Sequence, residues 1–146
     1  VMRPDIRELI QSGKTCVLAT VSEGQPHCSL MSYAADENGR EIYMATLRNT
    51  KKYKNLVVNP SVSLLIDARE GGSAGRPGTT RALTITGAFQ SGLGEQRREA
   101  LRQRLLARHP ELEDFLADPA AEIIVIKVKA LQLLEGVTDA YFEDVP

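Results

Sequence analysis

Four basic residues and two threonines gather in a short stretch of this chain, where a helix is expected to begin. The basic residues are Arg48, Lys51, Lys52 and Lys54, and the threonines are Thr46 and Thr50. We expect the helix to run from Lys51 to about Val58, because Asn59-Pro60 follows and ends it. A helix N-terminus carries unpaired N–H groups and partial positive charge, so cations are unfavourable there unless an anion lies among them.

A bound anion would explain this placement. The N–H groups of the first turn, the hydroxyls of Thr46 and Thr50 and the basic side chains would all face it, and a phosphate suits such a site. The alternative is an ordinary solvated basic face on a surface helix. Charge alone leaves both interpretations open.

The remaining reactive residue types give weaker signals. His27 begins an expected strand and is either a proton donor or a surface residue, whereas His109 precedes Pro110 at a helix end and is expected to be structural. A hairpin turning at 22–25 would pair Cys16 with Met31 and Cys28 with Ala19, so we expect no disulfide and two buried, reduced thiols. The sequence contains no Cys/His cluster with metal-ligand spacing.

Composition narrows the class of protein. The chain has 146 residues, a length that predicts a single domain over 1–146. Its formal net charge of −1 argues against a nucleic-acid binder with a broad basic surface. Aromatic residues make up 5% and Trp is absent, so stacking on nucleic-acid bases is not expected either. No apolar run approaches the roughly 20 residues of a membrane span. The first residues carry no apolar secretory core, and we expect a cytoplasmic protein.

Apolar and β-branched runs predict a mainly β protein, a β-barrel with peripheral helices. The six expected strands are Thr15–Val21, His27–Ala34, Ile42–Thr46, Val62–Asp67, Ala82–Phe89 (with a bulge at Gly87) and Glu122–Leu134. Besides the basic helix, we expect helices at Pro4–Ile10, Glu95–His109 and Glu111–Leu116. Arg69–Thr80 reads as a glycine-rich loop, either a connector or an active-site lid, and Asp139–Pro146 as an acidic tail.

The stretch 15–67 resembles the pyridoxamine 5'-phosphate oxidase-related family of FMN-binding split barrels. The resemblance rests on a strand ending in Ala45-Thr46, then Thr50-Lys51-Lys52-Tyr53-Lys54-Asn55-Leu56, then Asn59-Pro60-Ser61-Val62-Ser63-Leu64-Leu65. It implies a split six-stranded antiparallel barrel that forms a homodimer, with FMN at the subunit interface. Lys52 and Thr50 match the phosphate-binding pair of the family, Lys51 a second cation, and Thr46 a further phosphate contact. The flavin-ring strand of the family falls on Cys28, Ser29, Leu30 and Met31.

The resemblance implies a flavin-dependent oxidoreductase whose substrate is unknown. The stretch 125–146 has no arginine or histidine, whereas the vitamin oxidases of this family carry substrate-binding Arg and His residues there, so vitamin oxidation is not expected. A second possibility is a haem- or deazaflavin-binding relative that handles a ligand without catalysis. The segment 104–110 resembles haem-utilisation members of the superfamily.

Overall fold

The computed structural model describes residues 2–68, 81–136 and 138–146. Its strands form one antiparallel sheet of eight members, which are β1 (Thr15–Ser22), β2 (Gln25–Ser32), β3 (Ala34–Ala35), β4 (Glu41–Leu47), β5 (Ser61–Asp67), β6 (Arg81–Gln90), β7 (Ala121–Glu135) and β8 (Asp139–Asp144). The helices are α1 (Pro4–Ser12), α2 (Lys51–Val58), α3 (Glu95–Arg108), the 3-10 turn η2 (Pro110–Leu112) and α4 (Glu113–Ala117). The mainly β fold with peripheral helices is confirmed.

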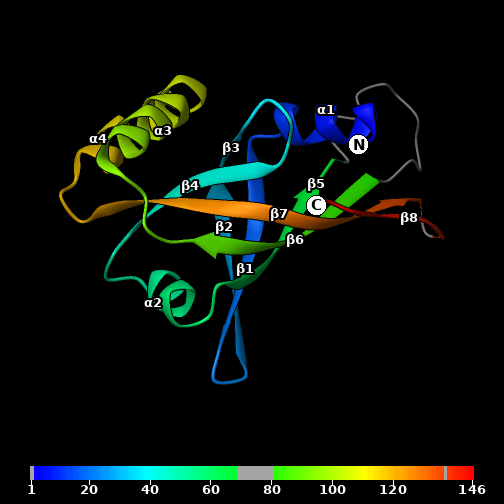
Figure 1. Ribbon diagram of the computed structural model, residues 1–146, viewed down its shortest axis with the longest axis horizontal. Coiled ribbons are helices and arrows are strands. Elements are labelled where there is room, and N and C mark those ends of the chain that lie inside the picture. Colours follow the sequence, from blue (N-terminus) through cyan, green and yellow to red (C-terminus); the bar gives the residue numbers. More distant parts are fainter. Residues whose placement is uncertain (1, 69–80, 137) are drawn as a thin grey trace.

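The sheet curls into a half-barrel in the order β2-β1-β5-β6-β7-β4-β3, and β8 pairs with β7 (Figure 1). The long strand β7 pairs with β4 through residues 121–127 and with β8 through residues 130–135. Within residues 125–135 it also pairs with β6. Strand β7 therefore joins β4, from the first half of the chain, to β8, near its end.

The hairpin of β1 and β2 has the predicted register, with Cys16 opposite Met31 and Cys28 opposite Ala19. Both thiols are free, as expected. Cys16 is buried, but Cys28 is exposed, so the expectation that both are buried is wrong for Cys28. The reason is the alternation of a strand, because Cys28 lies on the same face as Leu30, which is 75% exposed on the outside of the sheet.

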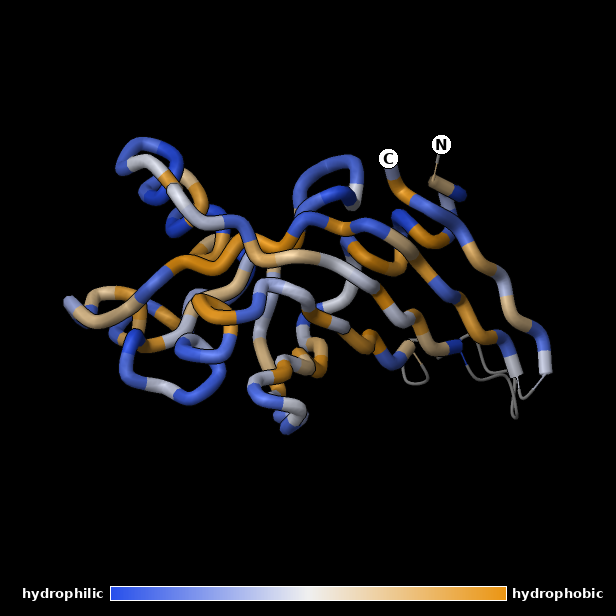
Figure 2. The backbone as a smooth tube through the Cα atoms, turned by 60° about the horizontal axis from the view of Figure 1, so that its bottom comes forward, coloured by the Kyte–Doolittle hydropathy of each residue, from blue (hydrophilic) through white to orange (hydrophobic). Residues whose placement is uncertain are grey.

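The core lies on the concave face of the sheet. Strand β5 shows the alternation clearly, since Val62, Leu64 and Ile66 are buried while its other residues are exposed. Helix α1 closes one end of this core with Ile6 and Ile10, both fully buried. Figure 2 shows the same alternation of hydrophobic and hydrophilic residues along the strands.

Helix α3 covers part of the outer face of the sheet. Leu101 and Leu105 pack with Tyr43 on β4 and Val125 on β7, and Leu116 of α4 joins the same apolar cluster. Figure 1 shows α3 and α4 together at one end of the molecule, away from α1.

Two features of the sheet test the sequence predictions further. The pairing of β6 with β7 shifts register between Thr86 and Gly87, which confirms the expected bulge. The acidic tail was a wrong prediction, because residues 139–144 form β8 against β7. The loop predicted at 69–80 lies outside the described residues.

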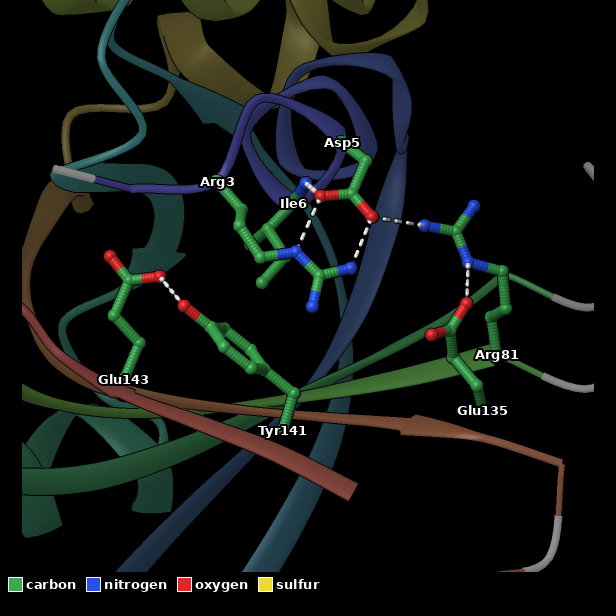
Figure 3. A network of polar contacts seen from close by, with 7 residues as sticks. All are labelled: Arg3, Asp5, Ile6, Arg81, Glu135, Tyr141 and Glu143. Atoms are coloured by element: carbon green, nitrogen blue, oxygen red, sulfur yellow. Dashed lines mark hydrogen bonds and ion pairs between the residues drawn. The ribbon is translucent and has the colours of Figure 1, made fainter. Parts of the chain in front are cut away.

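A polar network joins α1 to the edge of the sheet (Figure 3). The guanidinium of Arg3 donates two hydrogen bonds to the Asp5 carboxylate, at 3.0 and 2.6 Å, and lies 4.4 Å from the centre of the Tyr141 ring. Arg81 makes ion pairs with Asp5 and with Glu135, each at 3.7 Å. The strand β8 is thereby fixed to the first helix.

Candidate functional site

The basic turn lies where β4 ends and α2 begins, and Thr50 shapes it. Thr50 caps the helix, because its Oγ1 accepts a hydrogen bond from the Tyr53 amide at 3.3 Å and donates one to the Leu47 carbonyl at 2.9 Å. Thr46 is 2% exposed, and its hydroxyl lies 3.1 Å from that of Thr50. Both predicted hydroxyls are therefore adjacent at the start of the helix.

Two buried contacts hold α2 against the barrel. Leu56 is fully buried in the core. The buried Asn55 side chain donates a hydrogen bond to the Thr20 hydroxyl at 3.1 Å, which ties the helix to β1. Because the cap and these contacts fix α2, its N-terminal N–H groups have a defined direction.

A pocket with a volume of about 280 Å³ opens beside this turn. Its lining comes from β2, β4, the start of α2 and the helical segment after α3, and comprises Leu30, Met31, Ser32, Ala45, Thr46, Leu47, Thr50, Lys52, Leu112 and Phe115. Five of the nine predicted site residues lie here together, namely Leu30, Met31, Thr46, Thr50 and Lys52.

The two adjacent lysines of the turn differ in position. Lys52 is half-buried and lines the pocket, whereas Lys51 is exposed and does not. The guanidinium of Arg48 is bound elsewhere, at 2.8 Å from the Glu122 carboxylate and 3.0 Å from the Pro119 carbonyl oxygen. In the structure, Lys52 is thus the cation at the pocket.

Only part of the predicted flavin-ring strand contributes to the lining of this pocket. Leu30 and Met31 line the pocket and Ser32 lies beside them, but Cys28 and Ser29 are not among the lining residues. Cys28 is exposed further along β2, towards the hairpin turn.

Leu112 and Phe115 are lining residues that sequence reasoning missed. They come from η2 and α4, far along the chain from the basic turn. Phe115 keeps 36% of its surface exposed. The one available signal was this large apolar residue amid the acidic residues of a short helical stretch.

Ionisable chemistry in the pocket is limited. Among the described lining residues, Lys52 is the ionisable one. Burial raises the pKa of the Cys16 thiol to about 12, so this thiol is unreactive at neutral pH. His109 is buried, and its Nε2 lies 2.7 Å from the Tyr33 carbonyl oxygen, which confirms a structural role. The pocket can bind an anionic group at one end and apolar surface along β2.

Among the described residues, no three or more His, Cys, Asp or Glu side chains lie together in a group that could hold a metal ion. Among the helices in those same residues, none has the length and apolar character needed to cross a membrane.

The curled antiparallel half-barrel, with a basic helix start beside its pocket, defines a split-barrel protein. This chain belongs to the pyridoxamine 5'-phosphate oxidase family, whose sequence pattern matches residues 2–135. Over 69 residues it is 38% identical to the pyridoxamine 5'-phosphate oxidase homolog of Schizosaccharomyces pombe, a match covering 42% of this chain and 36% of that relative.

Solved structures share the fold at low sequence identity. A heme binding protein from Mycobacterium smegmatis superposes with a TM-score of 0.80 and 19% identity, over 99% of this chain and 60% of that one. A FAD-binding protein from Mesorhizobium loti superposes with a TM-score of 0.75 and 15% identity, over 94% and 96% of the two chains. These likenesses establish the fold.

Proposed function

We propose that this protein binds FMN and is a flavin-dependent oxidoreductase of its family. The observation that carries the proposal is the pocket in which Lys52, Thr50 and Thr46 meet Leu30 and Met31. Lys52, the Thr46 hydroxyl and the first amides of α2 would hold the phosphate, with Thr50 capping the helix beside it, while β2 and Phe115 would border the ring. Bound flavin supplies the electron transfer, and these residues bind and orient it.

We further propose that the protein is a homodimer with the flavin at the subunit interface. An apolar row on the outer face of the sheet supports this, since Leu30 pairs with Val17 and Val17 pairs with Leu65. Leu30 is 75% exposed and Leu65 is 41% exposed. Such a row is typical of a surface that a second copy covers, and it ends at the pocket through Leu30.

Haem is the second candidate ligand, and a deazaflavin is a further one. The heme binding protein from Mycobacterium smegmatis shares the whole fold of this chain. The apolar lining from Leu30, Leu112 and Phe115 suits a large planar ring of either kind.

The absorption spectrum of the purified protein, followed by release of any chromophore, tests these candidates. A flavin spectrum with FMN released on denaturation is expected. A Soret band would favour haem, and a released deazaflavin would replace FMN in the proposal. A colourless protein that does not bind added FMN would refute it.

Two lysine variants test the phosphate assignment. Lys52→Ala should weaken FMN binding at least tenfold, because it removes the cation at the pocket. Lys54→Ala is the matched control, since Lys54 is exposed on the same helix and does not line the pocket. Equal losses in the two variants, measured by calorimetric titration, would contradict the assignment.

A further inference from the structure

A second cavity lies on the other side of α2. Its volume is about 480 Å³, within the range of about 300–1,000 Å³ typical of ligand sites. It is bordered by α2, the end of β6, residues 90–93, the start of α3 and the start of β7. None of its lining residues lines the pocket beside Lys52, so the two sites are separate.

One wall of this cavity is aromatic and apolar. The rings of Tyr53 and Phe89 meet edge to face, with centroids 6.4 Å apart and planes at 78°. Leu56, Val57, Pro60, Leu93 and Ile123 complete the apolar lining. Two perpendicular rings form a corner that fits a flat ring, which can stack on one and meet the edge of the other.

The charged side chains of the lining are a paired cation and anion. Nη1 of Arg98 lies 3.5 Å from Oε1 of Glu122, and both residues line the cavity. The other oxygen of Glu122 accepts from Arg48 at 2.8 Å, and Nη2 of Arg98 donates to the Leu93 carbonyl oxygen at 3.2 Å. These contacts hold the two side chains in place and leave Nη1 of Arg98 and Oε1 of Glu122 too far apart for a good hydrogen bond.

A donor and an acceptor held side by side match one kind of group. A carbonyl oxygen next to an N–H, as in an amide or lactam, can accept from Arg98 while it donates to Glu122. A neutral group also suits this place, because a carboxylate would meet the charge of Glu122 and an ammonium that of Arg98.

We propose that this cavity binds a neutral, planar aromatic or heteroaromatic molecule with an amide or lactam edge, held by Arg98 and Glu122 against Tyr53 and Phe89. This inference does not rest on flavin binding, because the cavity and the pocket beside Lys52 share no lining residue.

Calorimetric titration with isoquinolin-1(2H)-one, a bicyclic lactam, tests the proposal. The lactam should bind, and its N-methyl analogue, which lacks the N–H, should bind at least tenfold more weakly. Undetectable binding of the lactam at millimolar concentration, or equal affinity for both compounds, would overturn the proposal.

Three variants localise the binding. Arg98→Gln should weaken lactam binding at least tenfold, whereas Arg102→Gln should leave it unchanged, because Arg102 lies one turn along α3 and pairs with Glu99. Ser91→Trp, at an exposed lining position, should fill the cavity and abolish binding. Thermal melting of each variant checks that it is folded. Equal losses in the two arginine variants would overturn the proposal.

Added FMN separates the two sites. Saturating FMN and the Lys52→Ala substitution should each leave the lactam affinity unchanged. Competition between FMN and the lactam would assign this cavity to the flavin site and overturn the proposal. If the protein binds no flavin, the lactam measurements still decide the matter.

Discussion

Nη1 of Arg48 lies 2.8 Å from Oε2 of Glu122, a residue 74 positions further along the chain. Arg48 belongs to the basic turn and Glu122 lies near the start of β7, so this ion pair fastens the turn to the sheet. The two basic residues therefore have different surroundings. The guanidinium of Arg48 is bound to Glu122 and to the Pro119 carbonyl oxygen, whereas Lys52 lines the pocket.

Arg48→Ala is therefore expected to weaken FMN binding less than Lys52→Ala. The free energy of unfolding should fall by roughly 0.2–1 kcal/mol, the usual size for a partly exposed ion pair. Calorimetric titration and urea unfolding measure the two effects. A loss of affinity as large as that of Lys52→Ala would show that Arg48 leaves Glu122 to contact the ligand.

His109→Ala should destabilise the fold without changing a bound chromophore. The side chain is 3% exposed, and its Nε2 lies 2.7 Å from the Tyr33 carbonyl oxygen, so the substitution leaves a buried polar group unpaired. We expect a loss of about 1–3 kcal/mol in the free energy of unfolding. His27→Ala, at a half-buried position in β2, is the control and should change stability less. A change in the visible spectrum of His109→Ala would contradict a purely structural role.

Gly87→Ala should destabilise the sheet by about 1–3 kcal/mol. A Cβ at this position would lie 2.7 Å from the Lys127 carbonyl oxygen and 2.7 Å from Cγ2 of Ile126, and the bulged backbone cannot move away freely. Gly94→Ala is the control, because a Cβ there meets no atom within 4 Å. Urea unfolding should give a lower free energy of unfolding for Gly87→Ala than for Gly94→Ala. Equal values would show that the bulge relaxes.

Asp5→Asn should lower stability near neutral pH but not in acid. The hydrogen bonds from Arg3 lower the pKa of Asp5 below its usual value of 3.8. A carboxyl with a lowered pKa in the folded state contributes stability above its usual pKa, and this contribution disappears as the pH falls through the folded pKa. Melting temperatures of the two proteins should therefore differ at pH 7, begin to converge as the pH falls below the usual value of 3.8, and meet only below the folded pKa of Asp5.

Asp114→Asn, in the first turn of α4, is a control for the general effect of an acidic residue at a helix start. A difference between Asp5→Asn and the unmodified protein that stays undiminished as the pH is lowered from 7 to about 2 would contradict the assigned role of the Arg3–Asp5 pair.

Local patterns in the sequence predicted much of the fold. Turn residues around Gly24 fixed the register of the first hairpin, and Thr50 and Asn59 marked the ends of α2. These features depend on residues that are adjacent in the sequence, so they can be predicted without knowledge of the fold. The anion site predicted at the start of α2 followed from the same local cues.

Contacts between distant segments could not be predicted in this way. Phe115 reaches the pocket and Arg48 reaches Glu122 only because the sheet curls and α3 and α4 fold back over it. Strand β8 was missed because Tyr141 and Phe142 lie among acidic residues, a composition that resembles a solvated tail. Its pairing with β7 supplies the stability that its own sequence does not indicate.

The position of β7 has a consequence for synthesis of the chain on the ribosome. The seven residues of β4 pair with β7 over their whole length, and the two-residue strand β3 covers only a small part of the opposite edge. When the ribosome has made the first hundred or so residues, β4 is finished but its main partner does not yet exist. The half-barrel therefore closes only after residues 121–127 leave the exit tunnel, and until then the nascent chain carries an open strand edge that chaperones can bind.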